Sequence, residues 1–113
     1  MARVSNGKSS KPGGNPPTVS HREKLIEELR SDPFLAAEYL NAAAEDDDPR
    51  VYLLALRTVA EAQGIAKIAK AARVPRESVY RALSANGNPR FTTLFAILKA
   101  AGFRFSVENV NLK

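Results

Sequence analysis

Residues 65–83 read IAKIAKAARVPRESVYRAL and predict two short helices joined by a sharp turn. Apolar side chains recur along both helices and in the turn, at Ile68, Ala69, Ala72, Val74, Val79, Ala82 and Leu83. The small side chain of Ala69 lets the second helix cross close to the first. This pattern is typical of a helix-turn-helix, in which buried residues fix the crossing of the two helices.

Charged and polar side chains fill the positions between these apolar residues, at Lys67, Lys70, Arg73, Arg76, Glu77, Ser78, Tyr80 and Arg81. In a helix-turn-helix that binds DNA, the exposed start of the second helix enters the major groove. Arginine can donate two hydrogen bonds to the O6 and N7 atoms of guanine, and glutamate can accept one from the amino group of cytosine. We therefore predict that this set of residues contacts DNA.

The predicted contacts are of two kinds. Those expected at base edges are Arg76, Glu77 and Arg81, with Tyr80 at a thymine methyl group or a phosphate. Those expected at phosphates are Lys67, Lys70, Arg73 and Ser78, with Lys67 also placed for a base edge and Ser78 for a helix cap. An ordinary charged helical hairpin can show the same short spacing of apolar and charged residues. The pattern alone therefore leaves this alternative open.

The net charge of +5 is unevenly distributed along the chain. Residues 1–24 hold five basic and one acidic side chains, residues 25–63 three basic and nine acidic, and residues 64–113 nine basic and two acidic. These segments carry +4, −6 and +7. A clustered positive surface favours a polyanion, because binding releases condensed counterions. A basic but inert solvated surface is the alternative interpretation.

Length and composition exclude several classes of protein. A chain of 113 residues, 44% of them hydrophobic, suits one small domain with a core. It has no cysteine and a single histidine, His21, so we predict no disulfide, no metal site and no cofactor. No apolar run approaches the roughly 18 residues of a membrane span, and there is no secretory signal. We predict a cytoplasmic protein that is not an enzyme, because no nucleophile is paired with a base.

Outside the helical pair, the sequence predicts an all-α domain of five or six helices over residues 21–113. Residues 1–20 are rich in Gly, Pro, Ser and Lys and are expected to form a disordered basic tail. Further helices are expected at residues 21–30, 33–44, 50–63 and from Pro89 to the glycine at 102. Aspartate or asparagine precedes proline at three of these starts, a capping signal: Asp32, Asp48 and Asn88.

Three further features bear on partners. The helix at 50–63 has an apolar band wider than a surface helix needs, so it is either central in the core or partly covered by another chain. The acidic run at 45–48 lacks the alternating ligands and glycine of a calcium loop, and Asp48 is better explained as a helix cap. Phe103, Phe105 and Val107 alternate with polar residues and predict a short C-terminal strand. Its partner would have to come from a second copy or another protein.

Residues 64–91, GIAKIAKAARVPRESVYRALSANGNPRF, resemble the helix-turn-helix core of the addiction-module antidote proteins, the antitoxins of bacterial toxin–antitoxin pairs. The most specific stretch is RESVYRALS followed by GNPRF, and the resemblance continues through FTTLFAILKAAGFRFSV. Upstream, DPFLAAEYLNAAAEDDDPRVYLLALRTVAEAQG is similar to the two preceding helices of that family. The resemblance covers about residues 32–107.

The resemblance implies a Cro/CI (lambda repressor)-like fold and a homodimer that binds double-stranded operator DNA and represses its own operon. It also implies a cognate toxin, usually a small basic ribonuclease of the RelE-like class. Carried onto this sequence, the positions that the resemblance implies for reading the DNA are Arg76, Glu77, Ser78, Tyr80 and Arg81, with Lys67 where relatives often have glutamine.

Two positions depart from the family pattern. Arg73 stands where a turn glycine is usual, so it must adopt an unusual backbone conformation or the turn must differ. Pro75 stands where a serine cap is usual; it removes a side-chain cap but presets the helical dihedral angle. Both departures affect the docking on DNA more than the fold. A helical protein-interaction domain that keeps this fold without reading DNA is the alternative function.

Overall fold

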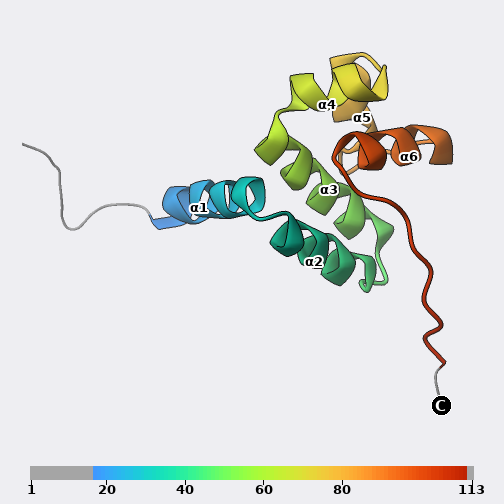
Figure 1. Cartoon of the computed structure of the whole chain (residues 1–113), viewed down its shortest axis with the longest axis horizontal. Helices are drawn as coiled ribbons and strands as arrows, with labels where there is room; N and C mark the ends of the chain where they lie inside the picture. The colour runs from blue at the N-terminus through green and yellow to red at the C-terminus, as the bar shows by residue number, and fades with distance from the viewer. Residues whose placement is uncertain (1–16, 112–113) are drawn as a thin grey trace, which may run out of the picture.

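The structure is a computed structural model that describes residues 17–111, with residues 17–20 described by their backbone alone. Over this range the chain is all-helical (Figure 1), with α1 (Pro17–Ser31), α2 (Pro33–Ala44), α3 (Pro49–Gln63), α4 (Ile65–Ala72), α5 (Arg76–Ala82) and α6 (Phe91–Ala100). The predicted all-α class and number of helices are therefore confirmed for the described residues. Helix α1 begins at Pro17 rather than His21, and the rest of the predicted tail lies outside the described residues.

Aspartate caps set the starts of α2 and α3, as the sequence predicts. The Asp32 carboxylate accepts hydrogen bonds from the backbone N–H groups of Phe34 and Leu35, both at 3.1 Å. The Asp48 carboxylate accepts one from the N–H of Arg50 at 2.9 Å. Each carboxylate thus satisfies N–H groups that the first helical turn leaves without a partner.

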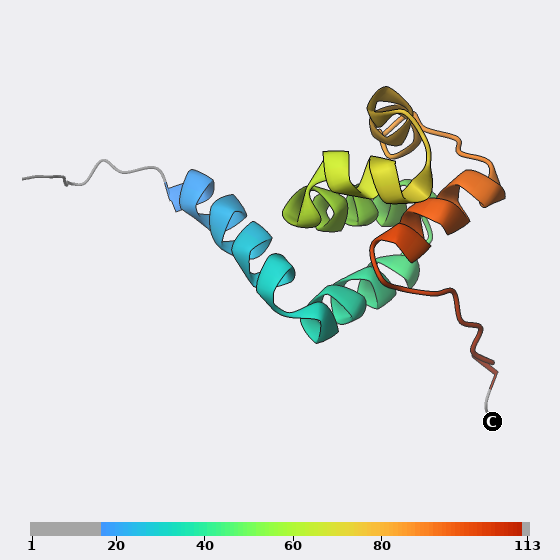
Figure 2. The same cartoon turned by 45° about the horizontal axis from the view of Figure 1, so that its top comes forward.

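Helix α3 is central in the bundle, which explains its wide apolar band. It packs against α1, α2 and α4, and the side chains of Leu56, Val59 and Ala60 are completely buried. Val51 and Leu54, on the same helix, remain partly exposed. Figure 2 shows α1 and α2 meeting in an open V beside α3, while α6 packs against α4 and α5.

Two long side chains join the C-terminal end of α3 to its neighbours. The Nε atom of Arg30 on α1 donates to the carbonyl of Ala62 at 3.0 Å. The side-chain amide of Gln63 donates to the carbonyl of Ala101, just after α6, at 2.9 Å. Gly64 then ends α3 with a φ of 104° and directly precedes α4. These bonds join the end of α3, which α4 directly follows, to α1 and to the residue after α6.

Two predictions about the C-terminal third are wrong: the start of the last helix at Asn88 and Pro89, and the short C-terminal strand. Helix α6 begins at Phe91 with Arg90 at its N-cap, because Arg90 is extended (ψ 152°) and its carbonyl accepts the first helical bond, from Leu94. The predicted short strand is absent from the described residues, where the chain after Gly102 is irregular and elongated (Figure 1). A strand requires a hydrogen-bonded neighbour, and residues 17–111 supply none to this segment.

Candidate nucleic-acid interface

Helices α4 and α5 cross on small and branched apolar side chains. Ile68 and Val79 are completely buried, and Ala69 is 6% exposed. Ala82 and Leu83 are also buried, whereas Val74 in the turn is half-buried against the core. The apolar positions that the sequence assigns to the crossing therefore pack as predicted, except Ala72, which is only partly buried and lies outside the core cluster. The remaining faces of the α4–α5 pair (residues 65–82) are available to a partner.

The turn between the two helices is held by a left-handed residue. Arg73 has φ 62° and ψ 41°, so of the two expected alternatives it is the unusual backbone conformation that is adopted and the turn is kept. The N–H of Val74 donates to the carbonyl of Ala69 at 3.1 Å, and that of Arg73 donates to Lys70 at 3.2 Å. Together these bonds form the usual left-handed ending of a helix, normally made with glycine. The arginine at this position keeps the turn and adds an exposed positive charge to it.

Helix α5 begins without a side-chain cap, as the proline at position 75 predicts. Pro75 is extended, with φ −62° and ψ 149°, and makes no side-chain capping bond. Its carbonyl accepts hydrogen bonds from the N–H groups of Ser78 and Val79 at 3.0 and 3.2 Å. The backbone alone therefore starts the helix, and the Ser78 side chain makes no N-terminal cap.

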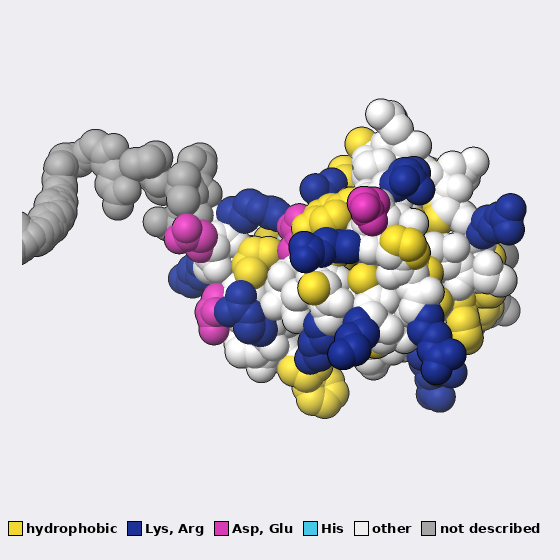
Figure 3. Space-filling view, turned by 90° about the horizontal axis from the view of Figure 1, so that it is seen from above, with side chains coloured by type: hydrophobic (Ala, Val, Ile, Leu, Met, Phe, Trp, Pro, Cys, Tyr) yellow, Lys and Arg dark blue, Asp and Glu magenta, His cyan; other side chains and the backbone are white. Residues whose placement is uncertain are grey.

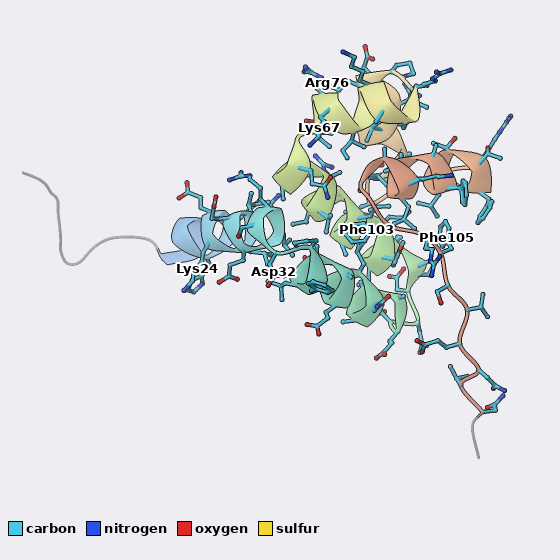
Figure 4. The ribbon with its side chains drawn as sticks, in the orientation of Figure 1. Lys24, Asp32, Lys67, Arg76, Phe103 and Phe105 are labelled. Carbon is cyan, nitrogen blue, oxygen red and sulfur yellow. The ribbon has the colours of Figure 1, made fainter. Side chains whose placement is uncertain are left out.

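Seven of the eight predicted contact residues are exposed, and the eighth, Ser78, is half-buried. Figure 3, which looks down on the side that carries α4 and α5, shows Lys and Arg side chains spread over this face with few carboxylates between them. In Figure 4, Lys67 and Arg76 both lie at the α4–α5 end of the molecule, whereas Lys24 lies on α1. The predicted contact residues thus lie on the α4–α5 pair and its turn, and all of them except Ser78 are exposed there.

Tyr80 has a partner that sequence reasoning did not identify. The guanidinium carbon of Arg57, on α3, lies 5.3 Å from the centroid of the Tyr80 ring, within the range of a cation–π contact. The Nε atom of Arg57 also donates to Glu61 at 3.3 Å, and Glu61 accepts from Arg22 on α1 at 2.5 Å. A chain of polar contacts therefore links α1 and α3 to the Tyr80 ring on α5. Arg57 positions Tyr80 rather than joining the exposed basic set.

The acidic loop between α2 and α3 is organised as a helix start. Hydrogen bonds from the Arg50 side chain, at 2.8–3.2 Å, and from its backbone hold the pKa of Asp48 below its usual range. The Asp46 carboxylate accepts from the N–H of Asp48 at 2.8 Å. Over residues 17–111, no group of three potential ligands is placed to hold a metal ion.

An apolar groove of about 440 Å³ lies between α2 and α3, close to this acidic loop. It is lined by Tyr39, Ala42, Ala43, Val51, Leu54, Ala55 and Thr58. Glu45 and Asp47 are exposed, and within the described part of the chain neither forms an ion pair. On α3, Arg50 is paired with Asp48 at the loop itself, and Arg57, further along the helix, shares Glu61 with Arg22. The groove therefore combines apolar walls with a net negative end.

A family model described as "Probable addiction module antidote protein" matches residues 21–109. The chain belongs to this antidote family. The match starts upstream of residue 32, where the resemblance in the sequence begins, and therefore includes most of α1. Among the helices within residues 17–111, none is both long and apolar enough to cross a membrane.

Membership of the antidote family implies a cognate toxin as partner. A Haemophilus influenzae relative described as an uncharacterized protein is 39% identical over 70 residues, which cover 62% of this chain and 72% of the relative. No solved structure matches the chain. The family thus provides the class of protein, an antidote with a cognate toxin.

Proposed function

We propose that this protein is an antitoxin that binds its own operator as a homodimer through a Cro/CI-like helix-turn-helix, represses its operon and neutralises a RelE-like ribonuclease. The observation that carries the proposal is the division of the α4–α5 pair. Its buried side chains fix one helix crossing, while seven of eight predicted contact residues stay exposed on a basic surface. A helical hairpin that serves the core alone does not require this concentration of exposed arginine and lysine.

In this proposal α5 enters the major groove. Arg76 and Arg81 donate to guanine, Glu77 accepts from cytosine, and Tyr80 contacts a thymine methyl group or a phosphate. The phosphate contacts come from Lys67, Lys70, Arg73 and Ser78. The left-handed turn presents the Arg73 charge beside the start of α5, where the DNA backbone passes in this docking mode. The ring of Tyr80 is held by Arg57, which lowers the entropy lost when the tyrosine binds.

The experiment that tests the proposal is fluorescence anisotropy of the full chain with a duplex from its own upstream region, at two salt concentrations. We expect a specific site that survives near-physiological salt, with an unrelated duplex binding far more weakly. Salt weakens non-specific binding steeply, because that binding derives almost entirely from counterion release. Equal, weak binding to both duplexes that disappears with salt would contradict specific reading and favour a protein-interaction domain.

We further propose that the toxin contacts the groove between α2 and α3 and the acidic loop beside it. An apolar helix or strand with basic flanks matches both features, because the groove is apolar and its free charge is negative. Opposite charges on two partners accelerate their encounter and suppress wrong partners. The groove lies on α2 and α3, so its occupation leaves the basic surface of α4 and α5 free for the operator.

Reversal of two charges in the loop tests this contact. We expect the double variant Glu45→Lys/Asp47→Lys to weaken binding of the basic protein encoded in the same operon by about tenfold at low salt. The difference should shrink at high salt, where exposed charges are screened. Asp46 and Asp48 are left unchanged, because both accept the hydrogen bonds that shape the start of α3.

The matched control is Glu23→Lys/Glu28→Lys, which makes the same change of charge at exposed positions on α1. Isothermal titration calorimetry with each variant gives the dissociation constants. An unchanged constant in the loop variant, or an equal loss in the control, would remove the acidic loop from the interface.

A further inference from the structure

The segment after α6 has apolar side chains and a backbone without partners. The N–H of Phe103 donates to the carbonyl of Leu98 at 3.1 Å, the last backbone bond between the segment and the helices. From residue 104 to residue 110, no backbone hydrogen bond joins the segment to other described residues. Val107 is 96% exposed and Val110 88%. An exposed backbone with apolar side chains is a template for pairing with another chain.

The start of this segment is fixed to α6 by three aromatic rings. The Phe105 ring stacks on Phe91 with a centroid separation of 5.3 Å and lies 6.1 Å from Phe95. The Phe91 and Phe95 rings are themselves 5.9 Å apart. All three side chains remain at least one third exposed. Figure 4 shows Phe105 beyond Phe103, on the chain that leaves α6. An apolar surface therefore lies directly beside the unpaired backbone.

The sequence of the segment is self-complementary around Ser106. If residues 103–109 pair antiparallel with the same residues of a second copy, and Ser106 faces Ser106, then Arg104 lies opposite Glu108. In the same register, Phe105 lies opposite Val107. Oppositely charged pairs and aromatic pairs with β-branched residues are the favourable cross-strand pairs in antiparallel sheets. A shift of the pairing register by one residue would put the apolar side chains of one strand on the same face as the charged side chains of the other.

We propose that residues 103–109 form an antiparallel two-stranded ribbon with a second copy, centred on Ser106. The partner's Val107 then lies beside Phe105 and covers the cluster of Phe91, Phe95 and Phe105. The arrangement is symmetric, so each copy makes both the charged and the apolar contact twice. A two-stranded ribbon alone is marginal in water, but packing on α6 of both copies supplies the hydrophobic face it needs.

The charge pattern selects a second copy as the occupant. A different extended partner would need its own acid opposite Arg104 and its own base opposite Glu108, whereas this chain already carries both at the required spacing. The inference rests on the proposed homodimer and specifies its interface. It also explains why the strand pattern of the sequence yields no strand in a single chain, since the second strand belongs to the second copy.

A charge swap tests the register. Sedimentation velocity over a concentration series gives the dimer dissociation constant of the full chain without DNA. We expect Arg104→Glu and Glu108→Arg each to raise this constant about tenfold, because each places like charges opposite one another twice per dimer. The double variant Arg104→Glu/Glu108→Arg restores opposite charges and should return to within about threefold of the parent.

The control Glu23→Arg makes the same change on α1 and should leave the constant unchanged. All positions are exposed, and circular dichroism verifies that each variant is folded. A parent that remains monomeric, single variants that dimerise like the parent, or a double variant that is not restored would each overturn the ribbon. Because DNA is absent, these results stand apart from the anisotropy experiment: failure of operator binding with a restored double variant would refute the proposed function alone.

Discussion

Replacement of Gly87 by alanine is expected to destabilise the protein by about 3 kcal/mol, the cost of forcing extra atoms into a close-packed site. A Cβ atom at this position would lie 2.3 Å from the carbonyl oxygen of Ala82 and 2.8 Å from that of Arg81. Both atoms belong to the backbone at the end of α5, so no flexible side chain can move aside. Relief of the clash requires a shift of the loop or of the last turn of α5.

Thermal or urea unfolding followed by far-UV circular dichroism measures this loss. For a domain of this size, about 3 kcal/mol lowers the melting temperature by roughly 10–20 °C. The control is Asn86→Ala, an exposed position in the same loop where we expect a change of at most about 0.5 kcal/mol. A Gly87→Ala variant as stable as the parent would show that the loop does not approach α5 this closely.

The starts of α2 and α3 and the α4–α5 crossing could be predicted because their causes are local. Asp32 and Asp48 each bond N–H groups within three residues, so the capping signal and its structure lie in the same short stretch. The crossing follows from apolar side chains at helical spacing, such as Ile68 and Val79. For Arg73, which stands where the family usually has glycine, the sequence left open an unusual backbone conformation or a different turn, and its φ of 62° shows that the first is realised.

The features that could not be predicted depend on residues far apart in the sequence. The contact between Arg57 and Tyr80 joins α3 to α5, and only the tertiary arrangement brings the two side chains together. The close approach of Gly87 to α5 is equally a matter of the folded loop. Asn88 and Pro89 carry a local helix-start signal, but α6 begins after them, because Arg90 is still extended when the loop ends.

In the C-terminal segment, the structure could not be predicted from the sequence for another reason. Alternation of Phe103, Phe105 and Val107 with polar residues is a genuine strand pattern, yet a strand is a property of a pair. In the described part of the chain the pattern has no neighbour, and the segment is elongated instead. The sequence pattern thus identifies a segment that is suited to pairing, and the fold shows that no other segment among residues 17–111 pairs with it.

The double variant Arg76→Ala/Arg81→Ala is expected to have the largest effect on function. Each arginine is exposed on α5, and a bidentate contact with guanine contributes about 1–3 kcal/mol of discrimination against the wrong base. The single variants Arg76→Ala and Arg81→Ala should therefore each weaken specific operator binding by about 1–3 kcal/mol and leave the fold intact. If the two contacts are independent, the double variant loses about 4 kcal/mol, a factor near 1,000 in the dissociation constant.

The matched control is Lys24→Ala, which removes one positive charge from α1, well away from the α4–α5 end of the molecule (Figure 4). If net charge alone determined binding, Lys24→Ala and either arginine variant would lose similar DNA affinity. The loss would be the same on the operator and on the unrelated duplex, because counterion release does not depend on base sequence. Base reading predicts a loss confined to the α5 variants and concentrated on the operator, while their binding to the unrelated duplex changes little. Equal operator affinity in the arginine variants and the parent would therefore remove α5 as the reading helix, even if the basic surface still binds DNA.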